Sequence, residues 1–363
     1  MSRKLPDIKS FSINQTQMKQ KYLKIFLGTI LTSLLIIFTS CQQVPDNQTV
    51  TIRSANSTFI QELFQTEVVN IGLEKLGYKI KKPKQIEYPA IYISLANGDL
   101  DYSVVYYEPQ HNEFFENAGG QEKLEKVGKL TPDGVQRYEI DKKTADKYNI
   151  TNLQQLKNPE IAKLFDSDGD GKANLVGCNP GWSCELTINH HLKAYELEDT
   201  VEHNQGQYEI LLADAMTRYQ EGKPILYYAY DTHWISTKLK PGKDVVWLEV
   251  PFTPLPKEMG NLTEKDTSLD GKNFGFQIMQ QRIVANKKFL KNNPVAKRWF
   301  ELVQIPVADM SEESLRIKEG EDQPEDILRH AQEWIKNNQE KCDSWLEKAR
   351  QETDSLDISN NKK

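Results

Sequence analysis

The spacing of apolar residues along the chain alternates between helical and extended patterns. Residues 58–76 place apolar side chains at helical spacing, and Gly77 follows as a typical helix end. Residues 91–97 predict a second, shorter helix. Apolar runs typical of strands occupy residues 103–107, 225–228 and 245–250. Helices that alternate with strands in this way predict an α/β architecture.

Two of the predicted strands bring aromatic residues to their carboxyl ends. The first ends at Tyr107, shortly before His111, and the second leads into Tyr230. Because ligands of α/β proteins bind beyond the carboxyl ends of strands, these three side chains are candidate ligand contacts. The alternatives are core packing for the two tyrosines and a surface turn for His111.

The segment 177–185 reads GCNPGWSCE and carries the most specific chemistry in the chain. Asn-Pro-Gly is strong turn chemistry, and a disulfide between Cys178 and Cys184 would lock this turn and project Trp182 outward. A helical pattern follows directly, so the backbone amides of Ser183 and Cys184 would lie at a helix N-terminus, where an anion is favoured. An aromatic face beside an anion site suits a zwitterionic ligand.

Two other interpretations of this segment remain open. One is a structural disulfide loop in which Trp182 packs as core. The other is an enzyme in which Cys184 is a thiol nucleophile and His190 or His191 is its base. On a single helix those histidines would lie roughly 9 to 10 Å from the cysteine along the axis, beyond hydrogen-bond reach, which disfavours the enzyme.

The amino-terminal segment predicts export. Residues 25–38 are apolar, follow a lysine-rich flank and are too short to span a bilayer comfortably, so residues 1–41 are interpreted as a signal peptide. Translation could begin at Met18, directly before this flank. Residues 38–41 (FTSC) resemble a bacterial lipoprotein box with Phe where Leu is usual, and we expect acylation of Cys41. Cleavage nearby without a lipid is the alternative.

Charge, length and cysteine content narrow the class of protein. The net charge of -6, with acidic and basic residues mixed along the chain, argues against a nucleic-acid surface. The length that remains after processing favours two domains. Once Cys41 is assigned to lipid, Cys178 and Cys184 form the obvious pair and Cys342 is a leftover thiol, which its helical pattern predicts to be half-buried. Residues 353–363 form a polar tail that we expect to be disordered.

Residues 166–171 (DSDGDG) match the first half of a calcium-binding loop, with acidic residues at alternate positions and a glycine for the sharp turn. The twelfth position of such a loop supplies a bidentate Glu, but Gly177 stands there. We therefore predict an Asp-Gly-rich turn without a metal and keep bound calcium as the alternative.

Several long stretches together resemble the glycine betaine/proline betaine binding proteins of bacterial osmoprotectant ABC importers. These stretches are residues 73–78, 107–111, 140–146, 177–185, 203–206, 222–228, 239–248 and 306–309. The resemblance covers nearly the whole mature chain. It implies an α/β fold of two lobes, type II-like among periplasmic binding proteins, with a hinge and with the ligand in the cleft between the lobes.

The resemblance also implies where the lobes begin and end. Lobe 1 is expected to comprise residues 42–140 plus 251–352, and lobe 2 residues 141–250. The chain would then cross between the lobes near Ile140 and again near Val250.

The family encloses a quaternary ammonium group in a box of tryptophans. Only Trp182 keeps a tryptophan here, and Tyr107 and Tyr230 occupy the other two positions. Both keep a π face, but Tyr is a weaker cation–π partner than Trp. The departure therefore bears on affinity and on ligand preference.

The family binds the ligand carboxylate with a histidine and with backbone amides that follow the box tryptophan. His111, Ser183 and Cys184 match these positions. Trp234 lies near the second strand end, and we expect it to pack behind the site instead of contacting the ligand.

The function implied by the resemblance is that of an extracytoplasmic solute-binding protein, not an enzyme, which delivers glycine betaine or proline betaine to an ABC permease with its ATPase. We expect a monomer, periplasmic or anchored to the cell membrane through Cys41, with no nucleic-acid partner, cofactor or metal. A binding protein for a choline-like methylated amine or for proline is the first alternative, and a cysteine-dependent enzyme is a weaker one.

Overall fold

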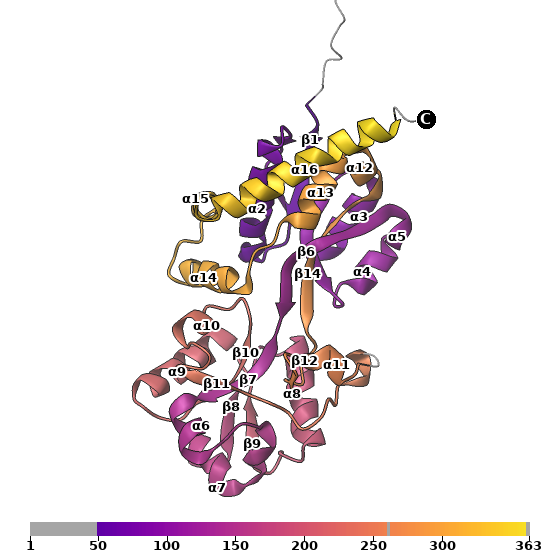
Figure 1. The fold of residues 1–363 in the computed structure, drawn as a ribbon. Coiled ribbons are helices and arrows are strands. Elements are labelled where there is room, and N and C mark those ends of the chain that lie inside the picture. The colour runs from indigo at the N-terminus through magenta and orange to yellow at the C-terminus, as the bar shows by residue number, and fades with distance from the viewer. Residues whose placement is uncertain (1–48, 260–261, 361–363) are drawn as a thin grey trace, which may run out of the picture. The chain divides into compact units, whose positions relative to one another are not determined.

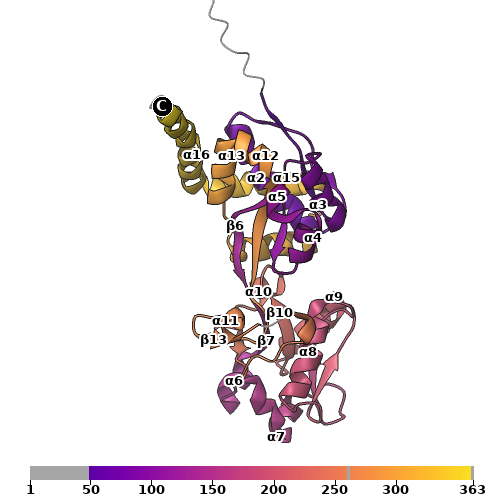
Figure 2. The same ribbon diagram turned by 90° about the vertical axis from the view of Figure 1, so that its right-hand side faces the viewer.

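The described residues form two mixed five-stranded β-sheets, each flanked by helices, and two short strand pairs (Figures 1 and 2). The structure is a computed structural model that describes residues 49–259 and 262–360. The first sheet has the strand order β4-β2-β5-β14-β6. Its strands are β2 (Ser54–Asn56), β4 (Lys84–Gln85), β5 (Tyr102–Glu108), β6 (Leu124–Gly134) and β14 (Met279–Asn286).

Strand β5 lies at the centre of the first sheet and is parallel to β2, whereas β14 runs antiparallel to both β5 and β6. A short parallel pair, β1 (Thr51–Ile52) with β3 (Lys79–Ile80), lies outside this sheet. The helices whose apolar faces form the first core are α2 (Ile60–Lys75), α3 (Tyr88–Asn97), α4 (Asn112–Asn117), α12 (Lys287–Asn292), α13 (Pro294–Leu302), α14 (Val307–Lys318), α15 (Pro324–Asn337) and α16 (Gln339–Asn360). The short helix α5 (Gly120–Lys123) leads into β6.

The second sheet has the order β11-β7-β10-β8-β9. Its strands are β7 (Gln136–Asp141), β8 (Ala173–Val176), β9 (Val201–Asn204), β10 (Leu226–Tyr230) and β11 (Val245–Leu248). Around it lie α6 (Lys142–Tyr148), α7 (Pro159–Ala162), α8 (Ser183–Ala194), α9 (Tyr208–Gln220) and α10 (Ile235–Lys238), with the 3-10 turns η1 (Leu153–Lys157) and η2 (Lys163–Phe165). Further on are η3 (Lys257–Met259), α11 (Glu264–Thr267) and the strand pair β12 (Ser268–Leu269) and β13 (Lys272–Asn273).

Each sheet contains one strand that runs antiparallel to its neighbours on both sides. In the first sheet this strand is β14, and in the second it is β7, which pairs antiparallel with β10 and β11. Strand β7 follows directly after β6 of the first sheet, and β14 is the first strand that the chain adds to the first sheet after β11 of the second. Each sheet thus contains an antiparallel strand that the chain adds after it has crossed from the other lobe, β14 in the first sheet and β7 in the second. This arrangement confirms the two-lobe α/β fold of the type II kind.

The two crossings between the sheets lie at positions that differ from those expected. Strand β7 begins at Gln136 and pairs with β10 and β11, so the chain changes sheet at Val135, before Ile140. On the return, Phe276 still belongs to the second core, after Val250. A buried apolar strand fits either sheet equally well, so spacing alone does not locate the change. The division into lobes remains a prediction, and the sheets favour boundaries near Val135 and beyond Phe276.

Most predicted elements are present with shifted ends. The helix predicted over residues 58–76 is α2, and the strand at residues 103–107 is β5. Gly77 follows α2 with a φ of 92°, a left-handed conformation that favours glycine. The carboxyl-terminal prediction differs, because α16 continues to Asn360 through the expected disordered tail. That stretch contains neither Gly nor Pro, the residues that stop helices most effectively.

Helices that pack on the first sheet contact the segment that follows β10 of the second sheet, and these contacts border the cleft between the two sheets. The Gln61 side chain on α2 donates from Nε2 to the carbonyl oxygen of Thr232 at 3.0 Å. On α14, the Ser314 hydroxyl accepts from the backbone N–H of Trp234 at 3.2 Å.

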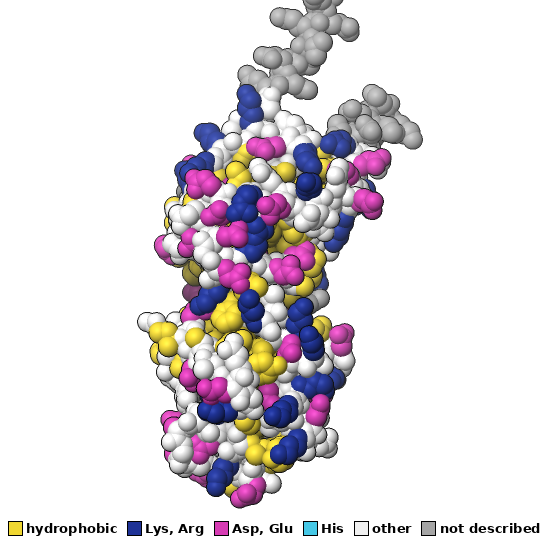
Figure 3. Space-filling model, turned by 90° about the vertical axis from the view of Figure 1, so that its left-hand side faces the viewer, with side chains coloured by type: hydrophobic (Ala, Val, Ile, Leu, Met, Phe, Trp, Pro, Cys, Tyr) yellow, Lys and Arg dark blue, Asp and Glu magenta, His cyan; other side chains and the backbone are white. Residues whose placement is uncertain are grey.

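Charged side chains of both signs are mixed over the face drawn in Figure 3, which agrees with the mixed charge of the sequence.

The signal peptide, the candidate start at Met18 and the acylation site Cys41 lie outside the described residues. Within the described part of the chain, no helix has both the length and the apolar character needed to cross a membrane.

Cys342 is fully buried in the first core, deeper than expected from its helical pattern, and is not in a disulfide.

Candidate functional site

The turn between β8 and α8 is closed by a disulfide. Cys178 and Cys184 are bonded, with their Cα atoms 6.5 Å apart, which confirms the pairing predicted from the sequence. Inside the loop, the backbone N–H of Trp182 donates to the carbonyl oxygen of Asn179 at 3.1 Å. Gly181 has a φ of 87°, a conformation that suits glycine in a tight turn. The turn is therefore held by covalent and hydrogen bonds on both sides of the tryptophan.

Trp182 is the residue that precedes the first turn of α8, and 41% of its surface is exposed. An indole offers no acceptor to the first-turn amides, so it cannot cap the helix as Ser or Asp would. The amides of Ser183 and Cys184 therefore begin a twelve-residue helix without a side-chain cap from this position. Such a helix start attracts a carboxylate.

Tyr107 and His111 stand at the carboxyl end of β5, where the chain turns into α4. The backbone N–H of His111 donates to the carbonyl oxygen of Tyr107 at 2.8 Å, which closes the turn. The two rings meet edge to face with centroids 5.2 Å apart. The His111 Nδ1 atom shares a hydrogen bond of 3.1 Å with the hydroxyl of Tyr92. Burial lowers the pKa of His111 to about 4, so the imidazole is neutral at physiological pH.

Tyr230 ends β10 and is partly buried among other aromatic rings. It stacks on Tyr208 with centroids 5.9 Å apart and meets Trp182 edge to face at 6.4 Å. Burial raises the pKa of the Tyr230 hydroxyl, so the ring stays a neutral phenol. Trp182 and Tyr230 thus form two adjoining walls of one aromatic corner.

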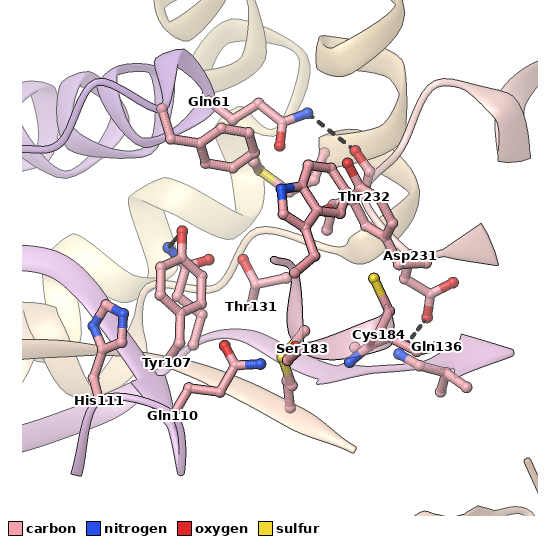
Figure 4. A pocket seen from close by; sticks show the side chains of 18 of the residues that line it. Gln61, Tyr107, Gln110, His111, Thr131, Gln136, Ser183, Cys184, Asp231 and Thr232 are labelled. Carbon is pink, nitrogen blue, oxygen red and sulfur yellow. Dashed lines mark hydrogen bonds between the residues drawn. The ribbon is translucent and has the colours of Figure 1, made fainter. Parts of the chain in front are cut away.

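All six residues predicted for the site line one cavity of about 480 Å³. Tyr107 is on β5 and His111 precedes α4, whereas Ser183 and Cys184 begin α8 beside the second sheet. Figure 4 shows the four side chains around the cavity. Trp182 and Tyr230 complete the set. Trp234 is not among the lining residues; it is buried, and its indole N–H donates to Glu209 at 2.9 Å, in agreement with the packing role expected for it.

Comparison with known proteins gives the chain a family. Residues 48–337 match the family described as the substrate binding domain of the ABC-type glycine betaine transport system. The chain belongs to this family. The resemblance inferred from the sequence is thereby confirmed.

Two relatives of this substrate-binding domain are similar over most of the chain. The glycine betaine/proline betaine-binding periplasmic protein of Escherichia coli (strain K12) is 45% identical over 326 residues, which cover 90% of this chain and 97% of that protein. The glycine betaine-binding periplasmic protein OusX of Dickeya dadantii (strain 3937) is 46% identical over 302 residues, which cover 83% and 90%.

Solved structures of more distant proteins share the fold of this substrate-binding domain. Lactococcal OpuAC, in a closed conformation with glycine betaine, aligns with a TM-score of 0.53 and 17% identity, over 82% of this chain and 99% of that chain. A choline-binding protein of an ABC transporter, in complex with choline, aligns with a TM-score of 0.52 and 17% identity, over 82% and 91%. At these identities the likeness establishes the fold and nothing finer.

Three further aromatic residues line the cavity of this substrate-binding domain and were not predicted. Tyr228 lies two residues before Tyr230 on β10, and this alternation, which puts both on one face of the strand, could have identified it. Phe59 precedes α2 and Tyr88 opens α3. Neither has a local sequence signal, because each is brought to the cavity by the packing of its helix.

The disulfide removes the basis for the enzyme alternative in this substrate-binding domain. The Sγ atom of Cys184 is bonded to Cys178, so Cys184 holds no thiol that could act as a nucleophile. His191 is fully buried, and its Nδ1 atom shares a hydrogen bond of 2.9 Å with the hydroxyl of Tyr138.

The DSDGDG segment of this substrate-binding domain forms a tight loop around the Asp166 carboxylate. Its Oδ1 atom accepts from the amide of Gly169 at 2.6 Å, and its Oδ2 atom accepts from the amide of Gly171 at 2.9 Å. These backbone bonds lower the pKa of Asp166. Carboxylate oxygens of Asp166, Asp168 and Asp170 lie within 4.8 Å of one another. Both the metal-free turn and the calcium alternative fit this geometry, and the choice stays a prediction.

Proposed function

We propose that this chain is the extracytoplasmic solute-binding protein of an osmoprotectant ABC importer and binds glycine betaine or proline betaine in the cavity between its two sheets. One observation carries the proposal: the three aromatic residues and the three carboxylate-binding positions predicted from sequence all line the same cavity. Residues chosen from separate parts of the chain converge there, as a single small zwitterion requires.

The aromatic residues suit the cationic end of the ligand. A trimethylammonium group has no N–H to donate, so hydrogen bonds cannot hold it, whereas the π faces of Tyr107, Trp182 and Tyr230 can. An unpaired carboxylate in direct contact would attract ordinary cations as well and would have to lose its water when the site is empty. Asp231 also lines the cavity, but its two carboxylate oxygens already accept from the Arg137 side chain and from the backbone N–H of Val135. Aromatic walls therefore favour a bulky, weakly hydrated cation over sodium or potassium.

The remaining positions suit the carboxylate end. The amides of Ser183 and Cys184 lie at the positive end of the α8 dipole. His111 is neutral at physiological pH and lines the cavity, and its ring N–H is proposed to donate to the ligand carboxylate. Charge-assisted hydrogen bonds of this kind are worth roughly 1.5 to 3 kcal/mol each.

The size of the cavity favours closure of the two lobes on the ligand. Glycine betaine has about eight heavy atoms, which at roughly 30 Å³ for each water-sized group fill about half of the 480 Å³. Micromolar affinity corresponds to about 8 kcal/mol, and so small a ligand reaches it only if nearly every atom is in contact. We therefore propose a hinge motion that narrows the cavity around the bound ligand.

The wider setting of the protein follows the same proposal. The chain is exported, is held at the membrane by a lipid on Cys41, acts as a monomer and delivers its ligand to a permease with an ATPase. Export is supported by the periplasmic relatives and by the apolar run at residues 25–38. Partitioning of the mature protein into detergent tests the anchor, and recovery in the aqueous phase would exclude it.

Calorimetry with glycine betaine, proline betaine, choline and proline tests the binding function. We expect one site per chain and micromolar affinity for a betaine, with weaker binding of choline, which lacks the carboxylate, and of proline, which lacks the methylated nitrogen. Tightest binding of choline would favour the methylated-amine alternative, for which the two tyrosines in place of tryptophans are the motivating observation. Absence of binding to all four ligands would reject the proposal.

A further inference from the structure

A buried carboxylate lies directly behind the aromatic wall of the first sheet. Glu62, in the first turn of α2, is fully buried and is not among the residues that line the cavity. Its Oε1 atom accepts from the hydroxyls of Tyr88 and Tyr107, each at 2.9 Å. Its Oε2 atom accepts from the backbone N–H of Ser57 at 2.7 Å. Both tyrosines line the cavity, so the carboxylate touches the site only through them.

The direction of the Tyr107 hydrogen bond follows from the chemistry of its partner. An ionised carboxylate can only accept, so the Tyr107 hydroxyl donates its proton to Glu62. The Nε2 atom of Gln281 lies 3.4 Å from the same hydroxyl, but its two N–H groups already donate to Gln65 Oε1 and to the carbonyl oxygen of Val104, at 2.7 and 2.9 Å. Tyr88 is held by the same carboxylate oxygen, and the two rings stand at 83° with centroids 6.5 Å apart. One buried group thus sets the orientation of two rings.

Glu62 has hydrogen-bond donors but no cation. Within residues 49–259 and 262–360, none of the ion pairs includes it. The hydrogen bonds from Ser57, Tyr88 and Tyr107 offset only part of the cost of removing a carboxylate from water, and burial accordingly raises the pKa of Glu62. A cation that enters the cavity on the other side of the two rings would supply the missing positive charge.

We propose that Glu62 is a positioning and specificity-determining residue, which orients Tyr88 and Tyr107 and places a negative charge behind them so that the cavity prefers a cation to a neutral group of the same shape. This inference rests on the proposed betaine function. A phenol that donates to a carboxylate gains electron density in its ring, so its π face attracts a cation more strongly. The rings meanwhile keep the carboxylate out of reach of small hydrated cations.

The substitution Glu62→Gln keeps the shape of the side chain and removes its charge. We expect it to weaken glycine betaine binding at least tenfold, whereas binding of 3,3-dimethylbutanoate, in which a carbon replaces the quaternary nitrogen, changes less than twofold. Glu67→Gln is the matched control, because Glu67 lies on the same helix, partly buried, and bonds to Asn70 instead of a cavity residue. It should leave both affinities within twofold of the wild type.

A second measurement covers the case in which the neutral ligand binds too weakly to measure. In a double-mutant cycle of Glu62→Gln with Tyr107→Phe, the two substitutions together should weaken betaine binding less than the product of their separate effects, since both break one hydrogen bond. Equal loss of both ligands, independent effects in the cycle, or unchanged betaine affinity in Glu62→Gln would each overturn the inference. Failure of the wild type to bind betaine would instead reject the proposed function.

Discussion

The indole of Trp182 meets the phenol ring of Tyr230 edge to face, with centroids 6.4 Å apart and planes at 72°. One ring comes from a disulfide-closed turn before α8 and the other from the end of β10. Rings set at such an angle present two different faces to the space between them. A spherical trimethylammonium group can contact both at once, which flat stacking would not allow.

Removal of one of these faces should weaken binding strongly. We predict that Trp182→Ala lowers affinity for glycine betaine by at least about 2 kcal/mol, roughly thirtyfold, without unfolding the protein. Calorimetry measures the affinity and a thermal melt verifies the fold. Leu186→Ala is the control, because Leu186 lies on α8 with 54% of its surface exposed and does not line the cavity. Unchanged affinity in Trp182→Ala would contradict the aromatic box.

Loss of the imidazole should affect only ligands that carry a carboxylate. We predict that His111→Ala weakens glycine betaine binding less than Trp182→Ala does, by about 1 to 2 kcal/mol, and hardly changes choline binding. Because burial lowers the pKa of His111 to about 4, wild-type affinity should also stay constant between pH 8.5 and 6.5. A titration of both ligands against both proteins measures this, and an equal loss for choline would place His111 elsewhere in the site.

Opening of the disulfide should cost both stability and affinity. The bridge closes a loop with a sequence separation of 6, for which chain entropy predicts a contribution of about 2 kcal/mol. We expect the double variant Cys178→Ser/Cys184→Ser to lose about that much in urea unfolding, and to bind betaine more weakly because Trp182 and the first-turn amides are less restrained. Reductant should bring the wild type to the same level and leave the variant unchanged. Equal stability of variant and wild type would exclude this role.

His191, which is buried in the second lobe, should make stability depend on pH. Burial lowers the pKa of His191 from 6.5 to about 3, so the unfolded chain takes up a proton before the folded protein does. The contribution of His191 is therefore complete above pH 6.5 and is lost as the pH falls toward 3, at about 1.4 kcal/mol per pH unit. Urea unfolding of His191→Gln between pH 6 and 4 should give a slope smaller by that amount. An unchanged slope would contradict the prediction.

The DSDGDG loop should not need calcium. Its twelfth position is Gly177, which supplies no bidentate carboxylate, and backbone amides already satisfy Asp166. We predict that saturating calcium stabilises the protein by less than about 1 kcal/mol in a thermal-shift titration. Magnesium at equal ionic strength controls for screening. Stabilisation of several kcal/mol by calcium alone would favour a bound ion.

Much of the local structure could be predicted because its causes are local. Gly77 ends α2, and the Asn-Pro-Gly turn brings Cys178 within bonding distance of Cys184, over spans that residue spacing describes directly. Tyr107 and Tyr230 were placed at strand ends for the same reason. The remaining site residues depend on which helix packs against which strand, and Phe59 and Tyr88 had no pattern of their own.

The helix that carries Glu62 shows what residue spacing does not predict. Spacing predicts α2 and marks its apolar positions, but a glutamate in the first turn is ordinary in a solvated helix. Its complete burial arises from Tyr88 on α3 and Tyr107 on β5, which approach α2 only when the first sheet is assembled.

The sequence by itself determined the α/β class, the disulfide turn and the types of side chain offered to a ligand, because these follow from spacing and from contacts between near neighbours in the chain. Only the tertiary structure decided that β7 joins the second sheet, that Tyr107 shares one cavity with Trp182, and that a carboxylate lies behind the tyrosines. Those features depend on packing between segments that are far apart in the sequence. Many apolar segments could pack on the same surface, and residue spacing does not predict which of them do.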